Sequence, residues 1–129
     1  KHWGTFFSLL GEFNQQWCKN AAVLVVIISK KNFDHNNKPS VTHQLDAGAA
    51  WENLALEGSS RGLVVHGMEG FDYQKARTTL KIPEEYDIEA MVAIGKRGKT
   101  DVLPKEMQER EIPSQRKALK DIIKEGPFA

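Results

Sequence analysis

The sequence predicts a domain of the α/β class, in which helices pack on a β-sheet, and three segments carry this prediction. Ala21–Ser29 is a continuous apolar, β-branched run bounded by charge, which is typical of a strand. Tyr86–Gly95 alternates polar and apolar residues and then becomes fully apolar, which predicts a second strand. Val41–Arg61 has the length and the small-residue content of a helix that packs closely against its neighbours.

The composition limits the size and the class of this domain. The chain has 129 residues, of which 40% are hydrophobic and 27% charged, so we expect a single globular domain over residues 1–129. A net charge of +1 gives no general argument for binding nucleic acid or a membrane. The longest apolar run, Ala21–Ile28, is too short to span a bilayer. No signal peptide is visible at the start of the sequence.

The single cysteine and the first residue bear on location and completeness. Cys18 has no second cysteine to pair with, so we expect a reducing, cytoplasmic location. We expect it to pack as a small hydrophobe at the end of a helix rather than to act as a nucleophile. The chain starts at Lys1 and enters a helical pattern at once, which favours missing upstream sequence. A processed or renumbered N-terminus is the alternative.

The first expected element is a helix over Gly4–Trp17, since its apolar residues recur at helical spacing. These residues are Phe6, Leu10, Phe13 and Trp17, and we place their aromatic rings in the core. The strand Ala21–Ser29 follows and is expected to be buried on both faces. The polar segment Lys30–Ser40 contains Asn36, Asn37 and Pro39 and is expected to form a loop.

Val41–Arg61 is the expected central helix, with Ser40 as its N-cap and Gly62 at the C′ position. Its bulky apolar residues Trp51, Leu54 and Leu56 point to more than one side, while Ala47–Ala50 are small. A helix that is apolar on several sides is buried on several sides. We favour a homodimer interface along this helix, and a central core helix in a monomer is the alternative.

The segment after this helix is expected to form a short extension, a turn and a second helix. Leu63–Val65 is a short apolar extension, and the chain is expected to break at Gly67, with a new helix starting at Met68. Asp72 is the expected cap of the helix that ends at Leu80, before Ile82 and Pro83. Beyond the strand Tyr86–Gly95 we expect an extended arm and a short helical turn within Lys117–Glu125.

Few motifs in the chain carry chemistry by themselves. No hydrolase triad, Walker loop, GxGxxG or HExxH sequence is present. Lys96–Lys99 is basic but lacks the glycine spacing of a phosphate loop. His35 and His43 lie eight residues apart with no cysteine or carboxylate at ligand spacing, so we assign no metal site from the sequence.

A set of motifs in one order resembles the nitroreductase family of FMN-dependent oxidoreductases. The set comprises a D-x-G-x-A-x-x-N helix (Asp46, Gly48, Ala50, Asn53), a GL strand, a GFD turn (Gly70–Asp72), an L-x-IP-x-x-Y link (Leu80–Tyr86), an AIG strand end and a closing R-K-x-L (Arg116–Leu119). Asn14, Trp17 and the strand at Ala21–Ser29 also fit the family. The Arg-x-Ser-x-Arg segment that opens the family is absent, so the chain resembles the family's C-terminal part.

The resemblance implies an α+β fold with a mixed sheet flanked by helices, built as a homodimer about the Val41–Arg61 helix. It implies FMN at the subunit interface and a ping-pong transfer of electrons from NAD(P)H to a nitroaromatic, quinone or similar acceptor. An inactive or flavin-less structural or interaction module of the same fold is the alternative.

The resemblance also implies site residues. Glu69 and Gly70 occupy the family's turn beside the isoalloxazine ring, although Gly67 and Gly70 could equally serve only to shape a turn. Arg116 matches the arginine that contacts the FMN phosphate, with Ser114 and Gln115 as neighbouring hydrogen-bonding groups. Lys117 is either a second cation at the phosphate or a solvated charge.

Overall fold

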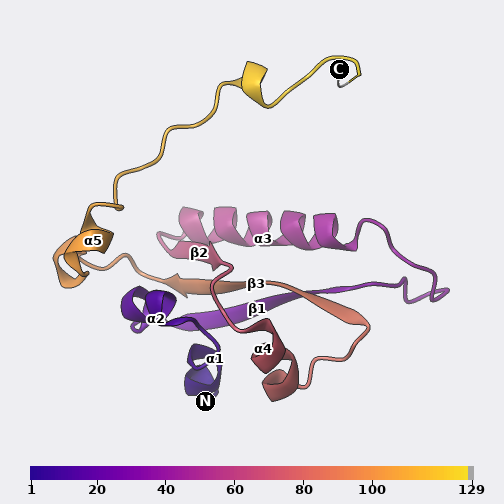
Figure 1. The fold of residues 1–129 in the computed structure, drawn as a ribbon, viewed down its shortest axis with the longest axis horizontal. Coiled ribbons are helices and arrows are strands. Elements are labelled where there is room, and N and C mark those ends of the chain that lie inside the picture. The colour runs from indigo at the N-terminus through magenta and orange to yellow at the C-terminus, as the bar shows by residue number, and fades with distance from the viewer. Residues whose placement is uncertain (128–129) are drawn as a thin grey trace. The chain divides into compact units, whose positions relative to one another are not determined.

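The computed structural model describes residues 1–127, which form two compact units that we describe separately (Figure 1). The first unit is Lys1–Gly98, and the second begins at Lys99. The elements of the first unit are α1 (Trp3–Phe7), α2 (Glu12–Cys18), β1 (Val23–Lys30), α3 (His43–Ser60), β2 (Val64–Met68), α4 (Tyr73–Leu80) and β3 (Tyr86–Gly95). The second unit contains η1 (Thr100–Val102), α5 (Lys105–Gln108) and η2 (Leu119–Asp121).

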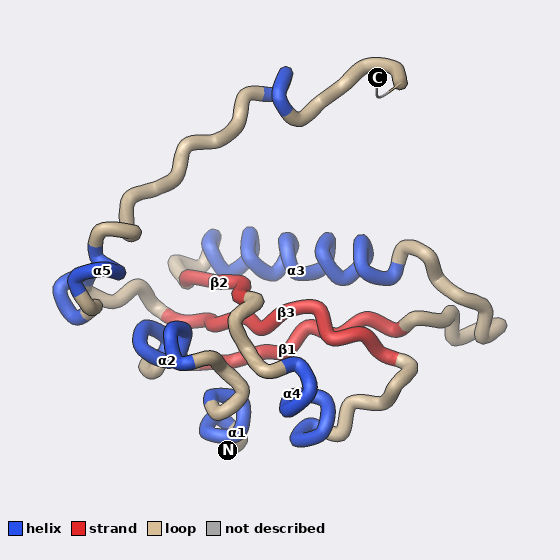
Figure 2. Tube along the Cα trace, in the orientation of Figure 1, coloured by secondary structure: helices blue, strands red, loops and turns tan. Residues whose placement is uncertain are grey.

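The three strands of the first unit form a sheet in the order β1-β3-β2 (Figure 2). Both strand pairs are antiparallel, with Val25 and Met68 opposite Val92 and Met91 respectively. The centre of β3 is fully apolar and buried at Met91, Val92 and Ala93, which explains why this strand lies in the middle. The predicted α+β class is therefore confirmed, although the sheet within residues 1–127 is antiparallel rather than mixed.

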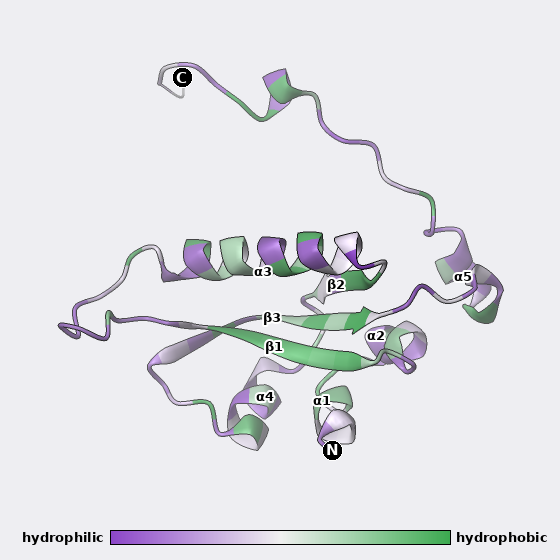
Figure 3. Cartoon of the chain, turned by 180° about the vertical axis from the view of Figure 1, so that it is seen from behind, coloured by the Kyte–Doolittle hydropathy of each residue, from purple (hydrophilic) through white to green (hydrophobic). Residues whose placement is uncertain are grey.

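Helices cover both faces of this sheet. Figure 1 shows α3 along one face and α1 and α4 on the opposite face, and Figure 3 shows hydrophobic residues along β1 and β3 between them. The buried core joins α1, α2 and α4 to the strands. Its members are Leu9, Leu10, Cys18, Leu24, Met68, Phe71, Ala76, Met91 and Ala93.

The single helix predicted over Gly4–Trp17 is wrong, because the chain leaves the helix between α1 and α2. Leu10 forms a β-bridge with Phe71, and the Leu9 carbonyl accepts a hydrogen bond from the Asp72 amide at 2.8 Å. These contacts with a distant segment replace the i→i−4 bonds that a continuous helix would make. The break also shifts the apolar face of α2, so that Phe13, predicted to lie in the core, is 51% exposed.

The strand predicted at Ala21–Ser29 is present as β1 but is not buried on both faces. It lies at the edge of the sheet within the described chain, and its exposure varies along its length. Leu24 and Ser29 are buried, whereas Val23 and Ile28 are exposed. An antiparallel edge strand with one covered face accounts for this pattern.

The helix predicted at Val41–Arg61 is confirmed as α3. Ser40 is not its N-cap, since Thr42 holds that position without a side-chain capping bond, and the Ser40 amide donates to the Lys31 carbonyl instead. The predicted C-terminal stop is confirmed, because Gly62 has a φ of +70° and the Leu63 amide donates to the Gly58 carbonyl at 2.9 Å. This is a Schellman closure of the helix.

The chain does not break at Gly67, and no helix starts at Met68. Gly67 lies within β2, opposite Val92 of β3. A Cβ atom at Gly67 would lie 2.9 Å from Cζ2 of Trp51, so glycine is present here because the Trp51 ring of α3 packs directly on the strand backbone. Close approach of another group is a common reason for glycine within a strand.

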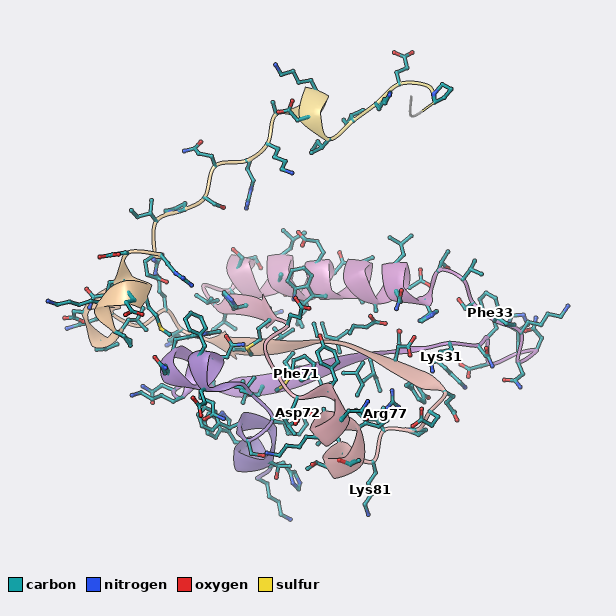
Figure 4. The ribbon with its side chains drawn as sticks, viewed as in Figure 1. Lys31, Phe33, Phe71, Asp72, Arg77 and Lys81 are labelled. Atoms are coloured by element: carbon teal, nitrogen blue, oxygen red, sulfur yellow. The ribbon has the colours of Figure 1, made fainter. Side chains whose placement is uncertain are left out.

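The link between α4 and β3 is fixed by one arginine side chain, labelled in Figure 4. Arg77 donates to the carbonyl oxygens of Ile82, Pro83 and Tyr86 at 3.2, 2.9 and 2.9 Å. The L-x-IP-x-x-Y motif therefore forms a loop whose backbone carbonyls are satisfied by a single guanidinium group.

The second unit is mostly extended, as predicted. It contains two short helical turns and one short α-helix, and η2 lies within the predicted segment Lys117–Glu125. Among the described residues, no helix is both long and apolar enough to cross a membrane.

Candidate functional site

The candidate site begins at the turn between β2 and α4, where Glu69 and Gly70 are exposed between two buried residues. Met68 and Phe71 anchor the two ends of this turn, with 7% and 9% of their surfaces exposed. The Phe71 amide donates to the Glu69 carbonyl at 2.8 Å, which closes a tight turn. A backbone segment that is exposed but held at both ends is well suited to contact a ligand.

The carbonyl oxygen of Gly70 is held by two donors from the N-terminal segment. The Gly11 amide donates to it at 3.0 Å, and Nδ2 of Asn14 donates at 2.9 Å. These two bonds use both lone pairs of the carbonyl oxygen. With this carbonyl occupied, and with the Phe71 amide bound to the Glu69 carbonyl, the donors that the turn has for a ligand atom of negative charge are the backbone N–H groups of Glu69 and Gly70.

Packing explains the glycine at position 70. A Cβ atom there would lie 2.7 Å from Nδ2 of Asn14, which is too close for the existing hydrogen bond to remain. Gly67 is required in the same way by the ring of Trp51. Both glycines thus have a structural reason, and a ligand-binding role for Gly70 stays a prediction.

Asn14 fits the family resemblance but was not predicted as a residue of this site. Its side chain is buried, and its Oδ1 accepts a hydrogen bond from Nε1 of Trp17 at 3.1 Å. The Trp17 ring lies against His66 of β2 with a centroid distance of 4.6 Å. In the sequence, the three-residue spacing of Asn14 and Trp17 could have indicated that these two side chains meet on one helix. The bond from Asn14 to Gly70 had no such signal, because the two residues lie 56 positions apart.

The other side of the turn is fixed by the start of α4. The Asp72 side chain accepts a hydrogen bond from the Lys75 amide at 2.9 Å, which confirms the predicted N-cap. Nζ of Lys75 reaches back to the Ser8 carbonyl at 2.6 Å. Phe71, next to Asp72 in Figure 4, stacks on Tyr73 with a centroid distance of 4.1 Å. The turn is thus held between the α1–α2 segment and α4.

Two groups near the site have shifted acidity. Burial, followed by the charges of Glu69 and Glu89, raises the pKa of the Tyr73 phenol, so it remains a neutral group at physiological pH. Burial also raises the pKa of the Cys18 thiol, which is 2% exposed. A protonated, enclosed thiol is a poor nucleophile, in line with the packing role expected for Cys18.

The remaining predicted site residues lie in the second unit. Ser114, Gln115 and Arg116 are exposed and lie in an extended segment without regular secondary structure, as does Lys117. The predicted site is therefore divided between the two units, with Glu69 and Gly70 in the first. That the two parts meet at one ligand stays a prediction.

Solved structures with this fold include oxidoreductases. One, described as an oxidoreductase containing FMN, is 42% identical to the chain, with a TM-score of 0.92 over 100% of the chain and 67% of that protein. A nitroreductase family protein from Streptococcus pneumoniae TIGR4 has a TM-score of 0.70 at 16% identity, over 98% of the chain and 75% of that protein. The fold and the turn therefore define an α+β protein of the same class as an FMN-containing oxidoreductase.

The sequence comparisons give the family. Residues 6–96 match the model of the nitroreductase family, and the chain belongs to that family. The chain is 29% identical over 125 residues to a 15.4 kDa protein from the ask 5′ region of Mycolicibacterium smegmatis, covering 95% of the chain and 83% of that protein. It is 44% identical over 54 residues to protein DrgA of Synechocystis sp., covering 42% of the chain and 26% of DrgA.

Proposed function

We propose that this chain belongs to an FMN-dependent oxidoreductase that passes electrons from NAD(P)H to a nitroaromatic, quinone or similar small acceptor by a ping-pong mechanism. The observation that carries the proposal is the turn at Glu69–Gly70, where Gly11 and Asn14 bind the Gly70 carbonyl, so that the backbone N–H groups of the turn would be its donors to a ligand. The 42% identity to an oxidoreductase that contains FMN supports the same cofactor here.

Two separate parts of the chain carry groups that would bind FMN, the turn at Glu69–Gly70 and the segment Ser114–Arg116. The N–H groups of the turn would donate toward the ring edge that gains negative charge on reduction, and the bonds that hold Gly70 keep them in position before the reaction. Arg116 would hold the phosphate through its planar fork of donors, with Ser114 and Gln115 as further hydrogen-bonding groups. When bound, FMN would supply the redox chemistry by accepting a hydride from the nicotinamide and passing electrons to the acceptor.

The proposed assembly is a homodimer about α3. Figure 1 shows the sheet along one face of this helix, and its residues Leu45 and Leu56 are 71% and 60% exposed, as is Val41 just before it at 95%. The small residues Ala47–Ala50 would let a second backbone approach closely. Sedimentation at micromolar concentration is expected to give a dimer, and a monomer alone would refute this interface.

Because the chain has one cysteine and no possible internal disulfide, we also propose a cytoplasmic location.

The visible spectrum of the purified chain tests the cofactor. We expect a flavin spectrum in the protein as isolated, or after addition of FMN, that is bleached by NADH or NADPH under anaerobic conditions. A colourless protein that takes up no added FMN would instead favour the alternative, a flavin-less interaction module of the same fold.

The phosphate contact is tested by Arg116→Ala, with Lys120→Ala as the matched control. Both residues are exposed, lie four positions apart and carry one positive charge, so a general charge effect would weaken binding equally in the two variants. Only Arg116→Ala would lose a hydrogen-bonded ion pair with the FMN phosphate, so the FMN dissociation constant of this variant should rise about tenfold or more. An unchanged constant would remove Arg116 from the site.

A further inference from the structure

Three potential metal ligands meet where α3 begins beside the first residues of β3. His43 is the first residue of α3, while Asp87 and Glu89 are two positions apart on β3 and therefore share one face of the sheet. Each offers one ligand atom, and these atoms lie within 4.8 Å of one another. All three residues are partly buried, with side-chain exposures of 18% for His43 and 35% for Asp87.

The hydrogen bonds around Ser29 indicate which nitrogen of His43 carries the proton. The Ser29 hydroxyl donates its only proton to the Glu89 carboxylate, so it must act as the acceptor toward Nδ1 of His43, which lies 2.7 Å away. In the neutral ring, Nε2 then keeps its lone pair and faces a carboxylate oxygen of Asp87 at 3.9 Å. Metal-binding histidines are commonly oriented in this way, with one N–H donated to a neighbouring oxygen.

In the neutral ring, the Nε2 lone pair of His43 therefore lies near a negatively charged oxygen of Asp87, an arrangement that a bound cation would stabilise. Lys31, labelled in Figure 4, contacts Oδ1 of Asp87 at 3.2 Å and neutralises one of the two negative charges. One negative charge remains on the cluster when His43 is neutral. A cleft of about 380 Å³ lined by Ser29 and His43 lies beside it and can hold water ligands.

We propose that His43, Asp87 and Glu89 bind a divalent transition metal ion such as Zn²⁺. One imidazole nitrogen and two carboxylate oxygens form a ligand set that such ions accept, with water in the fourth position. Tetrahedral bonds of about 2.1 Å place ligand atoms about 3.4 Å apart. The side chains must therefore close by roughly 1 Å on binding. The site uses none of the residues of the proposed flavin site and goes beyond that function.

The chain of 129 residues, freed of metal by a chelator, is titrated with ZnCl₂ by isothermal titration calorimetry. We expect one ion per chain, and at least tenfold weaker binding in His43→Ala and in Glu89→Gln. His35→Ala is the matched control, because His35 is exposed on the nearby loop and hydrogen-bonds only its neighbour Asn36 among the described groups. Its affinity should equal that of the wild type.

Two results would overturn the proposal. One is the absence of binding to the wild type at millimolar Zn²⁺. The other is an equal loss of affinity in His35→Ala and His43→Ala, which would indicate adventitious surface binding.

A measurement on the unmodified chain covers the case in which a variant fails to fold. The chain has four histidines, and their ring signals can be followed by NMR during the Zn²⁺ titration. The site predicts a shift confined to the ring of His43, with no effect of Mg²⁺ at the same concentration. Equal shifts of all four rings, or of His43 with Mg²⁺ as well, would contradict a built transition-metal site.

Discussion

Replacing Asn14 by alanine removes two side-chain hydrogen bonds, one that joins α2 to the turn at Gly70 and one to Trp17 within α2. Nδ2 of Asn14 no longer donates to the Gly70 carbonyl, and Nε1 of Trp17 loses its acceptor. Each neutral hydrogen bond contributes about 1 kcal/mol, and an unpaired, partly buried Trp17 N–H adds up to about 1 kcal/mol. The free energy of unfolding should therefore fall by about 2–3 kcal/mol, a large part of the 5–15 kcal/mol typical of a domain.

Urea unfolding of the single and double variants measures this effect. In a cycle of Asn14→Ala with Trp17→Phe, we expect a coupling energy of about 1 kcal/mol, because the two side chains share one hydrogen bond. Gln16→Ala, at an exposed position of the same helix, is the control and should change stability by less than about 0.5 kcal/mol. A coupling energy below about 0.3 kcal/mol would show that the hydrogen bond between Asn14 and Trp17 does not contribute to the stability of the chain.

Three further predictions concern the elements around the site. Gly58→Ala should destabilise the chain by about 1–2 kcal/mol in urea unfolding, because the added Cβ would lie 2.3 Å from Cγ2 of Val65. The control is Gly48→Ala on the same helix, whose added Cβ meets nothing within 4 Å and which should stabilise the chain by up to about 1 kcal/mol. A change of stability in the same direction in both variants would contradict the close packing of α3 on β2. Asp72→Ala should lower the free energy of unfolding by about 1 kcal/mol through the lost cap of α4, while Asp72→Asn should keep most of the stability of the cap. Burial raises the pKa of the Cys18 thiol, so the folded chain binds this proton more tightly than the unfolded chain. The free energy of unfolding should therefore fall as the pH rises above the ordinary pKa of a thiol. Iodoacetamide should label Cys18 slowly in the folded protein and quickly in urea, as followed by mass spectrometry, and equal rates would contradict its burial.

Features with a local physical cause could be predicted from the sequence. The strand Tyr86–Gly95 was predicted with its observed bounds, since its alternation directly reports which side chains face the core. The cap at Asp72 and the stop at Gly62 were also predicted, because each depends on hydrogen bonds within a few residues. The identity of the family rests on several such local motifs in one order.

Features that depend on distant contacts could not be predicted in this way. The apolar spacing from Phe6 to Trp17 fits one helix, yet the bridge between Leu10 and Phe71 divides it. Gly67 was predicted to end the apolar segment, but it lies within β2 because the Trp51 ring packs directly on its backbone. In both cases a tertiary contact outweighed a local preference, which is weak by comparison.

The sequence by itself determined β1, α3, α4 and β3, the fold class and the family resemblance, because these depend on local periodicity, capping and motif order. Only the tertiary structure decided which polar groups meet. The Gly70 carbonyl is bound by Asn14 across 56 residues, and Ser29 reaches Glu89 across 60. Strand pairing and helix packing bring such groups together, and no spacing along the chain records it. The anchored turn and the proposed metal site both arise from these long-range contacts.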